Sequence, residues 1–314
     1  MKKIIAWLLC IILLSFCGCA SSYIEQSSGD VIPPVQDSTV QTSTLVMPLY
    51  FRYYNEPMLI RYPMNIELTS HEQPEFYAIS ALLTDSFGQR PELTYCFKGK
   101  TELVSVDSDG EYLYVTLSED FYSDTKGSND EETRANRSIA IYSIVNTVCE
   151  MGNHSYVQFY IERNGTAMRP DAYEVGLVKT QADSTPIGPL SRDTSLILTP
   201  SNVVRMGLTY YSNHQWDKLY LYLGDKDSST AKMPLLEEMS QEFNYLNITM
   251  NEFTVEDNYT VSEDGKTAMV QVSFKLRTEN TGYEVSNVSL ELINKGRSWL
   301  ISYESLMHRL GVKP

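Results

Sequence analysis

The sequence predicts an α+β protein made of two small domains, and three observations lead to that class. Short stretches in both halves of the chain alternate apolar with polar residues, as strands with one buried face do. Longer stretches repeat their apolar residues at helical spacing. In the last third the helical patterns come first and the strand patterns follow, which is the order typical of α+β domains. A length of 314 residues and a hydrophobic content of 42% suit two folded domains.

Residues 1–19 predict a secretory signal peptide. Lys2 and Lys3 give a positive start, and residues 4–16 form an apolar core that is too short to be a good membrane span. Gly18 is the small residue that precedes a cut, which makes Cys19 the first residue of the exported protein. We therefore expect the chain to be exported.

Residues 16–19 resemble a bacterial lipobox, in which the cysteine after the cut is lipidated. The resemblance implies a lipid on Cys19 and anchorage at the outer face of the cytoplasmic membrane. Cys17 is a poorer candidate because bulky Phe16 precedes it, and Phe16 itself departs from the usual leucine. One acyl chain holds only marginally, whereas the two or three chains of a bacterial lipoprotein make a firm anchor. A signal that is left uncleaved, or is cleaved without lipidation, remains the alternative.

The negative charge of the chain disfavours binding to nucleic acid and to anionic lipid. The net charge is −15, and it becomes two charges more negative when Lys2 and Lys3 leave with the signal. Such a surface disfavours nucleic acid and also an electrostatic contact with anionic lipid. No apolar run after the signal approaches the length of a transmembrane helix. The expected contact with the membrane is therefore the lipid on Cys19.

Two cysteines remain after the lipidated position, Cys96 and Cys149. An exported pair can form a disulfide. Each of the two also has apolar neighbours, among which a free thiol packs as a small hydrophobic group. Their spacing does not show that they meet, so both states remain open, and the neighbours favour free thiols.

A polar tether is expected at residues 20–43, followed by a first domain at residues 44–166. Pro48 indicates an edge position or a bulge in the first strand, and Asp130-Glu131-Glu132 is expected to be solvated loop charge. The predicted elements, in order, are strands at 45–51, 58–62 and 64–68, a helix from 73 with Phe76, Ile79, Leu82 and Leu83 apolar, a hairpin of strands at 101–106 and 112–117, a polar loop at 122–132, a helix at 134–149 and a strand at 156–162.

This order of elements resembles the GerMN domain of sporulation and germination lipoproteins over about residues 44–166. The resemblance implies a small α/β sandwich and a role in spore formation or germination. There are departures: Asp85-Ser86 replaces a common Gly-Pro, Cys96-Phe97 stands where a proline is expected, and one such domain is found where the family often has two. The matching residues are Leu49-Tyr50-Phe51, Leu59-Ile60-Arg61, Ala78 with Leu82-Leu83, Gly99 ahead of Leu103, Val115-Thr116-Leu117-Ser118 with Phe121, and Asn164-Gly165.

Residues 167–198 predict a linker that contains several prolines and glycines, and residues 199–314 a second domain. Thr199-Pro200 begins its first helix, as a cap residue followed by proline. The linker is expected to end in a short strand at 194–198. The elements predicted for the second domain are a helix from 199, a helix at 233–245 with Leu235, Leu236, Met239 and Phe243 apolar, and strands at 248–255, 267–277, 284–293 and 299–303.

The second pattern resembles the cone-shaped nuclear transport factor two-like (cystatin-like) superfamily over about residues 199–310. The residues that match are Tyr210-Tyr211 with Trp216-Asp217, and Lys295-Gly296-Arg297 ahead of Trp299-Leu300-Ile301. A cone fold can enclose an apolar pocket, and the candidate aromatics to line it are Trp216, Tyr220, Tyr245 and Trp299. The alternative is that these aromatics are core residues that pack the helix onto the sheet.

Residues that could catalyse a reaction or hold a metal do not form a recognisable set. The four histidines are far apart and lack paired ligand spacing. Residues 107–110 imitate the start of a calcium loop, but Ser118 stands where its glutamate belongs, so a hairpin turn is expected. No nucleophile elbow, glycine-rich phosphate loop or Cys-x-x-Cys occurs. We expect no enzyme activity, no metal and no cofactor.

Two functional hypotheses follow from the sequence. The first is a non-enzymatic lipoprotein that acts as a scaffold or assembly factor, with envelope proteins and further copies of itself, as in a ring, as its partners. The second is an extracytoplasmic sensor that holds a small ligand near Trp216 and Trp299 and regulates a membrane partner such as a sensor kinase. A hydrolase or isomerase built on the cone fold is disfavoured because no acid–base pair is apparent.

Overall fold

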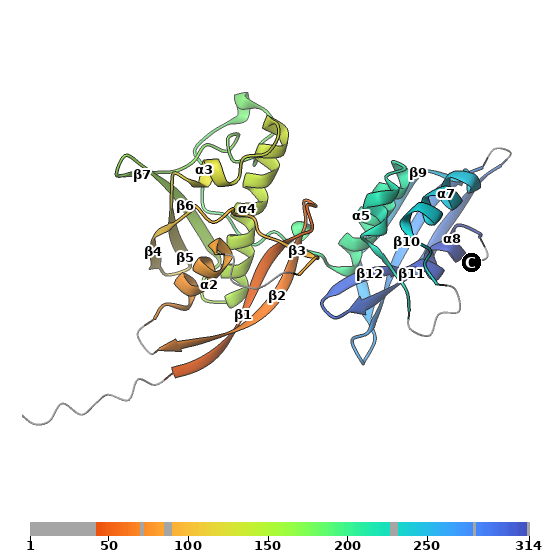
Figure 1. Cartoon of the computed structure of the whole chain (residues 1–314), viewed down its shortest axis with the longest axis horizontal. Coiled ribbons are helices and arrows are strands. Elements are labelled where there is room, and N and C mark those ends of the chain that lie inside the picture. Colours follow the sequence, from red (N-terminus) through yellow and green to blue (C-terminus); the bar gives the residue numbers. More distant parts are fainter. Residues whose placement is uncertain (1–41, 70–71, 85–89, 227–231, 279–280, 313–314) are drawn as a thin grey trace, which may run out of the picture. The chain divides into compact units, whose positions relative to one another are not determined.

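The computed structural model describes residues 42–69, 72–84, 90–226, 232–278 and 281–312, and the following account concerns these residues. They form a mixed α+β fold with three sheets, which confirms the predicted class (Figure 1). The predicted signal peptide, with Cys17 and Cys19, and nearly all of the predicted tether lie outside them. The lipidation site therefore stays a prediction.

The first sheet is built around a long hairpin. Its strand order is β2-β1-β3, with β1 antiparallel to both neighbours. The segments predicted at 58–62 and 64–68 are one strand that runs through Pro63. The strands are β1 (Thr42–Tyr53), β2 (Leu59–Thr69) and β3 (Leu93–Thr94).

Two prolines face each other in this hairpin without breaking it. Pro48 of β1 lies opposite Pro63 of β2. Two residues further along β1, the backbone N–H of Tyr50 donates to Oγ1 of Thr147 at 3.0 Å and not to β2. Alternate residues of a strand point their nitrogen to the same side, so the nitrogen of Pro48 also points away from β2. The proline therefore removes no hydrogen bond from the ladder.

The second sheet has the strand order β4-β5-β6-β7. The predicted hairpin joins β4 to β5, and Gly110 in its turn has φ +57°, a conformation that glycine adopts without strain. Strand β6 runs parallel to β5, so the chain crosses over between them through two helices. The strands are β4 (Leu103–Asp109), β5 (Tyr112–Ser118), β6 (Tyr156–Arg163) and β7 (Thr166–Met168).

Helix α4 (Asp130–Met151) contacts strands of both sheets, β1 and β6, and packs beside α2 (Pro74–Leu83) (Figure 1). It begins earlier than the predicted helix because Asn129 caps it, accepting the backbone N–H of Glu132 at 2.9 Å. The interpretation of residues 130–132 as loop charge is therefore wrong. Three acidic residues in the first turn of a helix are favoured by its dipole.

Two further expectations for the first domain are corrected. Phe76 of α2, expected on the apolar face, is 43% exposed and lies at the edge of the face that Ala78, Ile79 and Leu82 bury. The segment predicted as a polar loop contains the short helix α3 (Phe121–Asp124). Phe121 and Asp124 are both buried, so this part of the chain belongs to the folded domain.

Residues 167–198, predicted as a linker, are packed against the first domain. Val175 is fully buried and Ile187 nearly so. A 3-10 helix, η2 (Thr194–Leu196), stands where a short strand was expected, and only a single bridge joins Ile197 to Leu59. Another 3-10 turn, η1 (Gln181–Asp183), precedes it. We call residues 167–198 the connector.

The C-terminal part places helices before a mostly antiparallel sheet of order β8-β12-β11-β10-β9, in which β8 is parallel to β12. Helix α5 approaches β12 closely: a Cβ added at Gly207 would lie 2.5 Å from Cδ1 of Ile301. The elements are α5 (Pro200–Ser212), α6 (Trp216–Tyr220), β8 (Leu223–Gly224), α7 (Leu236–Leu246), β9 (Thr249–Val261), β10 (Thr267–Arg277), β11 (Gly282–Lys295), β12 (Ser298–Ser302) and α8 (Tyr303–Arg309). Assignment of this part to the cystatin-like superfamily stays a prediction.

Asp124 fixes the chain that leads into the second sheet. One oxygen of this buried carboxylate accepts the backbone N–H of Lys100 at 2.8 Å, the backbone N–H of Thr101 at 2.7 Å and the hydroxyl of Thr101 at 2.8 Å. Hydrogen bonds to a charged group are stronger than neutral ones, and removal of the acceptor leaves buried donors without a partner.

We predict that Asp124→Ala lowers the free energy of unfolding by about 3 kcal/mol, because it removes the acceptor of three hydrogen bonds. Urea denaturation monitored by circular dichroism measures the change. The matched control is Asp120→Ala, an exposed aspartate whose side chain caps nothing, with an expected change within about 0.5 kcal/mol. Equal changes in the two variants would show that Asp124 has no such role.

Candidate binding pocket

The aromatic residues predicted for a pocket in the C-terminal part do not gather around one. Trp216 is buried, packs on Tyr211 and Phe243 at centroid distances of 5.3 and 5.1 Å, and donates its Nε1–H to Asn244 at 2.9 Å. Trp216 is therefore a core residue, which was the alternative to a place in a pocket. Tyr220 is half-buried, with its hydroxyl 3.3 Å from the carbonyl of Pro234. Trp299 is half-buried in β12.

The prediction is wrong for Tyr245, which is 90% exposed. Met239 and Phe243 define the buried side of α7, and a residue two positions after Phe243 points to the opposite side of a helix. Leu235 and Leu236 are also exposed, although they were expected on the apolar face.

Both described cysteines have free thiols. Burial raises the pKa of Cys96 to about 11 and also raises the pKa of Cys149, whose Sγ lies 3.5 Å from the carbonyl of Ser155. Within the described ranges, no group of three His, Cys, Asp or Glu side chains is placed to hold a metal ion. In the same ranges, none of the helices has the length and apolar character that crossing a membrane requires.

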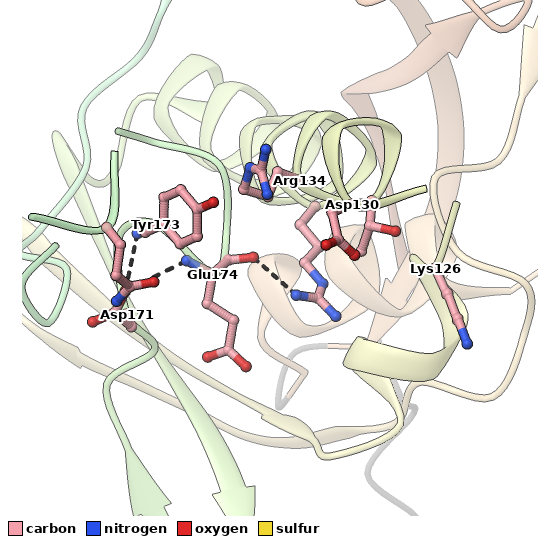
Figure 2. A pocket seen from close by; sticks show the side chains of 9 residues that line it. Lys126, Asp130, Arg134, Asp171, Tyr173 and Glu174 are labelled. Atoms are coloured by element: carbon pink, nitrogen blue, oxygen red, sulfur yellow. Dashed lines mark hydrogen bonds between the residues drawn. The ribbon is translucent and has the colours of Figure 1, made fainter. Parts of the chain in front are cut away.

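A pocket of about 660 Å³ lies between the first part of α4 and the connector (Figure 2). Positions three or four apart lie on one face of a helix, and this spacing brings four residues of α4 to the pocket. The lining residues are Lys126, which precedes α4, Asp130, Thr133, Arg134 and Arg137 of α4, and Asp171, Tyr173, Glu174 and Gln181 of the connector.

The connector side of the pocket is held in a tight turn. Oδ1 of Asp171 accepts the backbone N–H of Tyr173 at 3.0 Å and that of Glu174 at 3.4 Å. It also accepts the hydroxyl of Ser184. Gly176 has φ +75°, and a Cβ there would lie 2.2 Å from the carbonyl oxygen of Arg134. Only glycine lets the connector approach the backbone of α4 this closely.

Arg137 ties the two sides of the pocket together. Its Nη1 donates to the carbonyl of Glu174 at 2.9 Å, drawn in Figure 2, and its Nη2 lies 3.4 Å from the carbonyl of Tyr122. Its Nε is buried and has no hydrogen-bond partner among the described residues. Burial lowers the pKa of this guanidinium, while the carboxylate of Glu174 opposes that shift.

Tyr122 connects two charged residues that line the pocket, Arg137 and Glu174, with Arg163. The guanidinium groups of Arg137 and Arg163 lie 4.8 and 4.4 Å from the centre of the Tyr122 ring. The carboxylate of Glu174 accepts the Tyr122 hydroxyl at 3.1 Å and Nη2 of Arg163 at 3.2 Å. Burial, followed by this carboxylate, raises the pKa of Tyr122. The charge of Glu174 is thus satisfied within the protein.

Arg134 lines the pocket one turn after Asp130 on α4 and forms no ion pair with it. It lies over the ring of Tyr173 at 4.6 Å, and it forms none of the ion pairs found among the described residues. Lys126 at the rim forms none either. A half-buried guanidinium whose N–H groups are open can bind an oxyanion.

Sequence reasoning missed this pocket because Arg134 and Tyr173 are 39 positions apart and the connector was interpreted as a linker. One signal in the connector could have corrected that interpretation. Ala172 and Val175 are apolar residues three apart, and Gly176 and then two further apolar residues, Leu177 and Val178, follow them. Such a pattern predicts a packed turn better than a flexible linker.

Comparison with protein families finds a similarity for most of the first domain. The family named Germane, described as sporulation and spore germination, matches residues 48–165. Residues 48–165 form a GerMN-like domain. The match ends before the connector begins, so the GerMN-like domain supplies the α4 side of the pocket, and residues 171–181 supply the other side.

Solved structures with some similarity include the tandem GerMN domains of the sporulation protein GerM from Bacillus subtilis. That alignment has 18% identity and a TM-score of 0.34, and it covers 54% of this chain and 50% of that one. This chain therefore spans about half the length of that relative.

Two other solved structures align with smaller parts of the chain. The intermembrane space region of the chloroplast protein ARC6 aligns at 18% identity over 32% of this chain and 88% of that one, with a TM-score of 0.24. An LEH-like epoxide hydrolase of M. tuberculosis aligns at 12% identity over 36% and 87%, also with a TM-score of 0.24. Likenesses of this size establish no shared activity. No curated protein matches the chain.

The raised pKa of Cys96 predicts slow alkylation of the folded GerMN-like domain. A free cysteine has a pKa near 8.5, so at pH 9 an unfolded Cys96 is mostly thiolate, whereas a thiol with a pKa of about 11 is almost fully protonated. We expect iodoacetamide at pH 9 to modify Cys96 roughly 50-fold more slowly in the native protein than in urea, by peptide mass spectrometry.

The same shift has a consequence for stability. Because the fold favours the protonated thiol, its contribution is fully present below about pH 8.5 and is lost as the pH rises toward 11. Native and unfolded protein that react at the same rate at pH 9 would contradict the raised pKa of Cys96.

Proposed function

We propose that this protein is an exported, lipid-anchored and non-enzymatic component of the cell envelope that acts in spore formation or germination. The observation that supports this role is the match of residues 48–165 to a family described as sporulation and spore germination. The residues of the predicted signal and lipobox support the location. Its expected partners are the membrane, through lipid on Cys19, and envelope proteins, including further copies of the chain.

The side chains of the pocket support recognition rather than catalysis. The carboxylate oxygens of Asp171 and Glu174 accept hydrogen bonds from backbone, serine, tyrosine and arginine groups. The hydroxyl of Thr133 donates to the carbonyl of Asn129 at 2.7 Å. Groups used in this way fix the shape of a site and leave no activated nucleophile beside a base. The lining includes no histidine, cysteine or serine.

A second candidate, an extracytoplasmic ligand sensor that regulates a membrane partner, gains support from one observation. The pocket beside α4 has the volume of a small-molecule site. It lies beside the GerMN-like domain and not near Trp216 and Trp299, so the sensor proposal moves to this part of the chain. Scaffold and sensor differ in whether a small ligand is required for partner binding.

The anchor is tested by substitution. Cys19→Ser should abolish incorporation of a clickable fatty acid, because the sulfur that receives the lipid is lost, and the protein should leave the membrane fraction or accumulate as precursor. Cys17→Ser is the matched control and should be labelled like the wild type, because Phe16 makes that position a poor cleavage context. Labelling of Cys19→Ser, or loss of label in Cys17→Ser, would overturn the anchor at Cys19.

The role is tested in the organism that encodes the protein. A strain lacking the gene should lose tenfold or more of its heat-resistant spores, or germinate more slowly by the fall in optical density. The wild-type gene should restore the phenotype, and the Cys19→Ser gene should not, because the role requires attachment. Unchanged sporulation and germination in the deleted strain would refute the role.

A further inference from the structure

The pocket beside α4 has an arrangement of charges that selects among anions. Arg134 is half-buried, stacked on Tyr173, and free of any ion pair among the described residues. The chain as a whole has a net charge of −15, yet the guanidinium of Arg134 is partly desolvated and is paired with no carboxylate. Desolvation strengthens the attraction of such a group for an incoming oxyanion.

A second guanidinium adds to this field. Arg137 lies three positions after Arg134 on the same face of α4 and also lines the pocket. Its two terminal nitrogens are used by carbonyl groups, which carry no net charge, and its Nε is buried without a hydrogen-bond partner among the described residues. The positive charge of Arg137 therefore remains available to the pocket, where the carboxylate of Glu174 also acts on it.

Three carboxylates line the pocket and limit how much negative charge a ligand of this pocket can carry. Asp130 lies one turn before Arg134 on the same helix face, is exposed, and has no ion pair among the described residues. Asp171 and Glu174 border the other side. A dianion such as phosphate would be repelled by these three groups, whereas a single carboxylate can lie against Arg134 and leave room for a cation near Asp130.

We propose that this pocket binds a short peptide with free ends, its terminal carboxylate on the guanidinium of Arg134 and its ammonium toward Asp130. Arginine and carboxylate match in geometry and form two parallel hydrogen bonds. The volume of about 660 Å³ suits a ligand of a few residues, and the Tyr173 ring offers an apolar surface beside the charge. This inference concerns the pocket alone and does not depend on lipidation or on a role in spores.

The experiment titrates the full chain, in mild detergent, with trialanine by isothermal calorimetry. The same peptide with an amidated C-terminus, the same peptide with an acetylated N-terminus, and inorganic phosphate are titrated beside it. We expect trialanine to bind, amidation to weaken binding at least tenfold, acetylation to weaken it less, and phosphate to bind more weakly than trialanine.

Variants assign each end of the peptide to a residue. Arg134→Gln should weaken trialanine binding at least tenfold, and Arg277→Gln, an exposed arginine of β10, should leave it unchanged. In Asp130→Asn the acetylated and free peptides should bind equally, because the partner of the ammonium is gone. Asp130 is exposed, so this variant tests the site without a risk to folding.

Gly176→Ala provides a test that changes no charge. Its Cβ collides with the carbonyl of Arg134, so the connector must move from α4 and the affinity for trialanine should fall. Thermal melts show whether each variant is folded. Absence of binding by trialanine in the wild type, equal binding of the amidated peptide, or tighter binding of phosphate would each overturn the proposal.

Discussion

Helix α4 is held in the described part of the first domain by two sets of contacts, with the strands of the sheets and with the connector. Asn146 is fully buried in α4, and its side-chain amide pairs with the backbone of Asp193, accepting its N–H at 2.9 Å and donating to its carbonyl at 3.0 Å. At the other end of the helix, Gly176 lies against the carbonyl of Arg134. Between these points the apolar residues of α4 face the sheets. The helix is therefore covered by the connector where the sheets do not reach, and its buried polar atoms find partners there.

The pocket follows from that packing. A helix face with Asp130, Arg134 and Arg137 is an ordinary polar surface while it is solvated. Once the connector lies across it, the same side chains border a space of limited volume, and their charges act through a medium of lower dielectric constant. Tyr173 holds the guanidinium of Arg134 from one side, so little side-chain entropy remains to be lost when an anion binds.

The sequence predicted the elements that depend on local patterns and missed those that depend on distant contacts. Periodicity located the two main helices of the first domain, its long strands and four of the five strands of the last sheet, because each buries one face over many residues. It missed β8, which is only two residues long. It missed α3, because a buried aspartate such as Asp124 looks like a loop residue until its backbone partners are known. It also mistook the connector for a linker, because prolines and glycines favour turns whether or not those turns are packed. Tyr245 shows the opposite error, because it was expected to be buried and is exposed. It is an aromatic residue of an amphipathic helix, but it lies two positions after buried Phe243 and so points to the other side.

The two sides of the pocket have different origins, and this bears on what the site is for. Residues 48–165 match the GerMN-like family, and they supply the helix. Residues 171–181 lie beyond the match, and they supply Tyr173, Glu174 and the close approach of Gly176. A fold does not determine its function, which resides in sites added to it. The pocket therefore belongs to this chain's combination of domain and connector, and any ligand it binds would favour the packed connector, since it contacts both sides. A ligand stabilises an arrangement only in so far as it binds that arrangement more tightly than others, so a ligand that contacts both α4 and the connector stabilises their packing.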